Sequence, residues 1–180
     1  MPLPAGSTRV AAIDGCIACD LASGRAPLPG GRIHETHHWV VEHCVGPLGL
    51  GTLIVKPRRH VVHVADLRGE EVDELGGLLR AASSAVGALL QPDQVYVTLW
   101  SHANGEPGHI HWVVQPVTRD LVASYEGLHG PQLQVAMLDR DESPPTAEVE
   151  EVAAALRSWF AQNAAALGET PAAPRRKDER

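Results

Sequence analysis

The chain has 180 residues, 44% of them apolar, and it carries 15 Lys and Arg against 22 Asp and Glu, for a formal net charge of −7. This length suits one domain with a single core. The sequence lacks an apolar run of the roughly 20 residues that a membrane helix needs and the charged-then-apolar start of a signal peptide, and its net charge argues against sequence-independent binding to nucleic acid. We therefore expect a cytoplasmic protein without a membrane or nucleic-acid partner.

The first half of the chain predicts a leader, two strands and a long helix. Residues 1–15 carry Pro, Gly and small residues without periodicity, which indicates a flexible leader. The β-rich runs HWVVEHCV, from His37, and TLIVKP, closed by Pro57, predict two strands joined by a glycine-rich turn. Between Asp66 and Leu90, apolar residues recur every three or four positions. This spacing predicts an amphipathic helix packed on a sheet, with Asp66 as its N-cap.

The second part of the chain predicts a hairpin and a further helix. The runs QVYVTLWS and HIHWVVQPV predict two antiparallel strands around the loop HANGEPG. We expect a main domain over 16–138, a linker over 139–146, a helix over 147–166 capped by Thr146, and a disordered charged tail over 167–180. The predicted class is α+β: an antiparallel sheet with a long packed helix and a C-terminal helix.

The histidine and cysteine contents are the features of the composition that point to a chemical function. The chain has 10 His against 1 Phe, 2 Tyr and 2 Met, and its 3 Cys are too few for a disulfide framework. In the run GHIHWVVQP, strand alternation places His109, His111, Val113 and Gln115 on one face, with Trp112 directed into the core on the other. A neutral imidazole on such a face can attack phosphorus. The alternative is a pair of solvent-facing or buried structural histidines.

Cys16 and Cys19 form a CxxC pair, which supplies two of the four ligands of a tetrahedral zinc site. His109 and His60 are the candidate partners, and His63 can substitute for His60. A thiol redox pair is the alternative, although such pairs are typical of the start of a helix in a βαβ unit.

Taken together, CIAC, GTLIVKPRRH and HIHWVVQP, in this order and at these separations, resemble the histidine triad superfamily of nucleotide hydrolases and transferases. The resemblance covers residues 16–117. It implies that His111 is the nucleophile that attacks the α-phosphate and becomes nucleotidylated. It also implies that Cys16, Cys19, His60 and His109 hold a closed structural zinc ion, which fixes the strand and does not activate water.

Two positions depart from the family pattern. Val113 stands where the third triad histidine belongs, and Gln115, one pleat later, either contacts a phosphate oxygen or is simply a polar residue at the end of a strand. Where many members have an acidic residue for the ribose hydroxyls, this chain has His43, with Glu42 expected to face away.

The loop before the histidines lies where the family contacts phosphate, so Asn104, Gly105 and Gly108 are candidate substrate-binding residues; a hydrophilic hairpin loop is the alternative reading. The resemblance implies hydrolysis at the α-phosphate of nucleoside polyphosphates, dinucleoside polyphosphates or phosphoramidates, by a homodimer. In that reaction Asn104 and Gln115 would stabilise the phosphoryl oxygens. The alternatives are a nucleotidyltransferase and a zinc-stabilised nucleotide-binding protein with little turnover.

Overall fold

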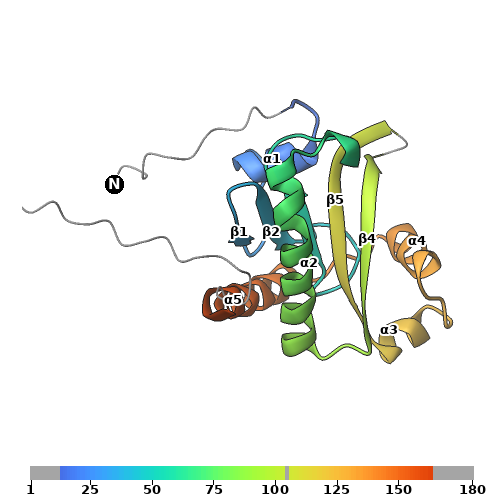
Figure 1. Cartoon of the computed structure of the whole chain (residues 1–180). Helices are drawn as coiled ribbons and strands as arrows, with labels where there is room; N and C mark the ends of the chain where they lie inside the picture. The colour runs from blue at the N-terminus through green and yellow to red at the C-terminus, as the bar shows by residue number, and fades with distance from the viewer. Residues whose placement is uncertain (1–12, 104–105, 164–180) are drawn as a thin grey trace, which may run out of the picture.

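The protein folds around a five-stranded antiparallel sheet with the strand order β1-β2-β3-β5-β4 (Figure 1). The computed structural model describes residues 13–103 and 106–163. The strands are β1 (Arg32–Glu35), β2 (Trp39–His43), β3 (Leu53–Pro57), β4 (Gln94–Ala103) and β5 (Glu106–Val117). All neighbouring strands pair antiparallel, and β4 and β5 form the predicted hairpin. The predicted α+β class is confirmed.

Helices cover both faces of this sheet. They are α1 (Ile17–Ser23), the 3-10 turn η1 (Val64–Asp66), α2 (Gly69–Leu90), α3 (Arg119–Ser124), α4 (Pro131–Arg140) and α5 (Thr146–Asn163). On one face, α2 and α5 pack on strand residues such as Trp39 and Val114 to form the larger core. On the other face, Leu133 and Met137 of α4 pack with Val113 of β5 in a second, smaller core. Figure 1 shows α2 running along the sheet, with α3 and α4 beside β4.

The long helix begins two residues later than expected, with Arg68 rather than Asp66 at the N-cap position. Asp66 ends the 3-10 turn, so the prediction that it caps the helix is wrong. The first turn of α2 is held instead by Glu71, whose carboxylate accepts a hydrogen bond from the Arg68 N–H at 2.7 Å. This is the reciprocal half of a capping box. At the other end the helix stops at Leu90, and Gln91 adopts a left-handed conformation with φ 47°.

The C-terminal helix belongs to the main core. Val149, Ala153, Leu156 and Phe160 of α5 are buried, and the last three of these residues join the core formed by α2 and the sheet. The expected linker over 139–146 is shorter in the structure, because α4 extends to Arg140 and α5 starts at Thr146. Most of the expected leader and all of the expected tail lie outside the described residues.

Five elements were not predicted: α1, β1, η1, α3 and α4. Helix α3 is capped by the Thr118 hydroxyl, which accepts from the Leu121 N–H at 3.1 Å. Helix α4 has Pro131 in its first turn and buries Leu133 and Met137, which are four residues apart. That spacing was the available signal for α4. Within the described ranges, none of the helices is both long and apolar enough to cross a membrane.

Candidate functional site

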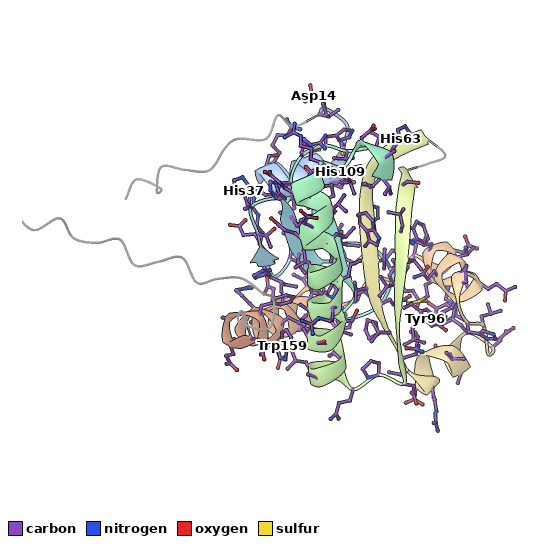
Figure 2. All side chains as sticks on the ribbon, in the orientation of Figure 1. Asp14, His37, His63, Tyr96, His109 and Trp159 are labelled. Atoms are coloured by element: carbon purple, nitrogen blue, oxygen red, sulfur yellow. The ribbon has the colours of Figure 1, made fainter. Side chains whose placement is uncertain are left out.

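Four candidate ligands from three separate segments meet at one end of the sheet. Cys16 immediately precedes α1 and Cys19 lies in its first turn; His60 follows β3, and His109 is in β5 (Figure 2). Their ligand atoms all lie within 4.8 Å of one another. The Cys19 Sγ is 3.4 Å from the His60 Nδ1 and 3.6 Å from the His109 Nδ1. Ligands around a tetrahedral zinc ion lie about 3.5 Å apart at ordinary bond lengths, so the cluster fits this metal.

A further hydrogen bond orients His109 toward the cysteines. Its Nε2–H donates to the Pro57 carbonyl oxygen at 2.9 Å, which leaves Nδ1 as the lone-pair nitrogen facing the thiols. Such a carbonyl partner is typical of metal-bound histidines. Burial lowers the pKa of His109 to about 4, so the ring is neutral at pH 7. Of the two alternatives for the third ligand, the cluster contains His60, whereas His63 is exposed.

His111 lies next to this cluster with one ring nitrogen directed by the backbone. Its Nδ1 is 3.1 Å from the His109 carbonyl oxygen. A carbonyl oxygen only accepts, so Nδ1 carries the proton and the lone pair is on Nε2. Burial lowers the pKa of His111, which favours this neutral form. Trp112 lies on the opposite face against Trp39, with ring centroids 5.5 Å apart, as predicted.

Val113 and Gln115 share the face of His111 but are fully buried. The Gln115 Nε2 donates to the Leu48 carbonyl oxygen at 3.0 Å, and its Oε1 accepts from the Gln134 Nε2 at 3.0 Å. Helix α4 therefore covers this side chain and uses its polar atoms. The expectation that Gln115 contacts a phosphate oxygen needs correction, because its amide is part of the packing between β5 and α4.

His43 is also used by the fold. It is 1% exposed; its Nδ1 donates to the Cys44 carbonyl oxygen at 2.7 Å, and its Nε2 accepts from the Gly51 N–H at 2.9 Å. Both ring nitrogens are engaged, so the expected role of His43 at a substrate sugar is not supported by its geometry. Its function in this structure is to hold the turn between β2 and β3.

Glu42, rather than His43, lies on the face of the histidines. Glu42 pairs in register with Ile54, and Ile54 pairs with Val113. Residues at paired positions project to the same side of a sheet, so the expectation that Glu42 faces away from the site is corrected. Its carboxylate forms an ion pair with Lys56, and both side chains are buried. The signal in the sequence was a charged residue inside each of two apolar runs, VVEHCV and TLIVKP.

The remaining candidates belong to the loop before the histidines. Asn104 and Gly105 lie outside the described residues. Gly108 is part of β5, directly before His109. The site that the structure describes therefore consists of the Cys16, Cys19, His60 and His109 cluster with His111 beside it.

Several solved structures share the fold of this chain. A zinc-bound histidine triad family protein from Mycobacterium smegmatis superposes with a TM-score of 0.59 at 23% identity, covering 84% of this chain and 97% of that chain. The chain has the histidine triad fold. A Hit-like protein involved in cell-cycle regulation from Bartonella henselae gives a TM-score of 0.62 at 19% identity, with 82% and 97% covered.

A hypothetical histidine triad nucleotide-binding protein from Sulfolobus tokodaii gives a TM-score of 0.61 at 14% identity, covering 82% of this chain and 93% of that chain. No family model and no curated protein matches the chain. The sequence has thus diverged far from its structural neighbours while the histidine triad fold is kept over most of its length.

Proposed function

We propose that the protein is a nucleotide hydrolase that acts at the α-phosphate of nucleoside polyphosphates, dinucleoside polyphosphates or phosphoramidates, with His111 as the nucleophile. The observation that carries this proposal is the His111 ring: its Nδ1 is bonded to the His109 carbonyl oxygen at 3.1 Å, so the lone pair is on Nε2. The histidine triad fold around it supports nucleotide chemistry, since structural neighbours are histidine triad proteins, one of them described as nucleotide-binding.

The reaction has two steps. The His111 Nε2 forms a bond to the α-phosphorus while the bond from this phosphorus to the leaving group breaks, and the leaving group departs with the electron pair. Water then attacks the phosphorus of the nucleotidyl-histidine, and a nucleoside monophosphate is released as the N–P bond breaks. Asn104 and Gly105, together with the Gly108 backbone, are the proposed contacts to the phosphoryl oxygens.

We further propose that Cys16, Cys19, His60 and His109 hold a structural zinc ion. With four protein ligands the ion would have no open position, so its contribution would be to fix α1, the end of β3 and the start of β5 relative to one another. The same contacts would hold the His109 backbone, whose carbonyl orients His111.

A homodimer through β4 is the proposed assembly. β4 lies at the edge of the sheet and has β5 as its neighbour, and Val97 and Leu99 on this strand are exposed at 45% and 44%. An edge strand with exposed apolar side chains favours pairing with a second copy. Sedimentation of the wild type and of the double variant Val97→Lys/Leu99→Lys tests this: we expect a dimer and a monomer, respectively.

Product analysis tests the activity. Wild type is incubated with adenosine and guanosine polyphosphates, dinucleoside polyphosphates and phosphoramidates, beside His111→Ala and the exposed control His129→Ala. Release of a nucleoside monophosphate by wild type and the control, lowered about 10³-fold or more in His111→Ala, supports the proposal. Equal rates for His111→Ala would contradict it.

Two alternative functions would use the same site. Transfer to an acceptor differs from hydrolysis in what resolves the intermediate, so acceptors are added to the same panel. A nucleotide-binding protein with little turnover is favoured by Val113, a buried side chain without a donor at the third triad position. Its signature would be nucleotide binding that persists in His111→Ala, with no product from wild type.

A further inference from the structure

Glu42 and Lys56 form a buried ion pair on the same face of the sheet as His111. The carboxylate of Glu42 is bonded to the ammonium of Lys56, and the two side chains are 2% and 1% exposed. Removing two charges from water costs several kcal/mol for each ion, and apolar residues of similar volume are often at least as stable in such a place. The pair therefore calls for an explanation beyond packing.

The register of the strands places Lys56 beside His111. Val55 of β3 pairs with Trp112 of β5. Lys56 and His111 each lie one position beyond this pair, in the same direction along the sheet. Their side chains consequently project from neighbouring strands on the same face.

The hydrogen-bonding capacity of the pair is not saturated. Among the residues that the structure describes, the Glu42 Oε2 has no hydrogen-bond partner although it is buried. A buried acceptor without a partner is costly, so this pair has not been optimised for stability alone.

Other cations near the site are directed elsewhere. Arg58 forms an ion pair with Glu35 at 3.0 Å, and the Arg59 guanidinium is bonded to the Glu71 carboxylate at 2.8 Å. The third triad position is Val113, which offers no donor. Lys56 is thus the buried cation on the face where His111 would meet a phosphoryl group.

We propose that Lys56, held in place by Glu42, supplies the fixed positive charge that draws a phosphoryl group to His111, in place of a third histidine. The proposal rests on the proposed function for its reaction but not for its binding step. Because Lys56 is buried, its charge acts through the protein interior, where electrostatic interactions are stronger than in water. Negative charge that develops on the phosphoryl oxygens during attack would be stabilised in the same way. Glu42 is the positioning residue for Lys56.

The test distinguishes loss of the Lys56 charge from loss of folding stability. In the double variant Lys56→Met/Glu42→Met, two apolar side chains of similar volume replace the pair, so we expect a Tm within a few degrees of wild type or higher. The matched control is Arg119→Gln/Asp93→Asn, which removes an exposed ion pair at the other end of β5. Should the first double variant not fold, Lys56→Met/Glu42→Gln takes its place. Metal content shows whether the cluster is intact in each variant.

Binding of AMP and of inorganic phosphate is measured by calorimetry, and kcat and KM are measured with the best substrate of the panel. We expect the Lys56 variant to bind both anions about 10-fold more weakly and to lose about 100-fold in kcat/KM, while the control matches wild type. Anion affinity and kcat/KM within about threefold of wild type would overturn the proposal, and so would a wild type that binds neither anion. If wild type binds the anions through Lys56 but releases no product, the proposed hydrolysis fails and the role of Lys56 stands.

Discussion

Each end of β5 carries polar side chains on the same face of the sheet, but in very different environments. At the end beside α1, where Figure 2 labels His109, the strand contributes to the Cys and His cluster and carries His111. Toward α3, near Tyr96 in Figure 2, the same face carries Val113 and Gln115, which α4 covers completely. The alternation of side chains is identical along the strand. What differs is the element packed on it, and this determines which polar residues can meet a ligand.

The largest expected effect is at the cluster end. Cys19→Ser removes a proposed zinc ligand, so we expect loss of the metal and a fall in Tm of about 10 °C, because metal binding contributes to the folding free energy. Cys44→Ser is the matched control, since Cys44 lies outside the cluster. Elemental analysis and calorimetry of both variants give the answer. If Cys19→Ser retained zinc at an unchanged Tm, the end of β5 beside α1 would not depend on this metal ligand, and the proposed contrast with the end covered by α4 would be contradicted.

At the covered end, the change Gln115→Leu tests whether this residue supports packing or chemistry. It removes one hydrogen bond from the Leu48 carbonyl, which still accepts from the Thr52 hydroxyl, and one from the Gln134 amide, which still donates to the Thr98 hydroxyl. We therefore expect a loss of about 1–2 kcal/mol in the free energy of unfolding. Denaturant titration measures it. Because the amide is directed at α4, kcat/KM should stay within about threefold of wild type. A fall of about 100-fold in kcat/KM with little loss of stability would show that Gln115 takes part in the reaction.

The smallest expected effect lies at the start of α2, which is distant in sequence from both ends of β5. Burial acts to raise the pKa of Glu71, but the hydrogen bonds from Arg59 and from the Arg68 N–H outweigh it, and the pKa lies below its ordinary value of 4.5. A carboxyl with a depressed pKa in the folded state stabilises the protein above the ordinary pKa, and this contribution is lost as the pH falls through the folded value.

Glu71→Gln keeps an acceptor for the Arg68 N–H but removes the charge that pairs with Arg59. We expect a loss of about 1 kcal/mol at pH 7. The difference in Tm between variant and wild type should narrow as the pH falls below 4.5. Thermal melts of both proteins from pH 7 to well below pH 4.5 measure it. A difference that does not change with pH would mean that Glu71 contributes through packing alone.

Local sequence patterns predicted much of the fold and the candidate residues of the Cys and His cluster. The strands β2 to β5, the long helix and the C-terminal helix follow from apolar spacing, which depends on residues near one another in the chain. Ligand chemistry left His60 and His63 as alternatives beside Cys16, Cys19 and His109, and the resemblance carried by three short motifs implied the set with His60. The structure brings these four residues together.

Three residues were assigned roles that the structure corrects. The direction of Glu42 was taken from strand alternation, and the roles of His43 and Gln115 from their places in the family pattern. What each one does depends on a partner elsewhere in the chain: Lys56, Gly51 and Gln134. Spacing within a strand reports which side a residue faces only when the register is known. It does not report what covers that side.

By itself, the sequence predicted the α+β class, four of the five strands and the candidate metal ligands, with His60 and His63 as alternatives, because periodicity and ligand type are local properties. Only the tertiary structure decided that Glu42 and Lys56 meet beside His111, and that α4 buries Gln115. Those outcomes depend on strand register and on helix packing over long sequence separations. Both are set by the free energy of burying the whole core at once.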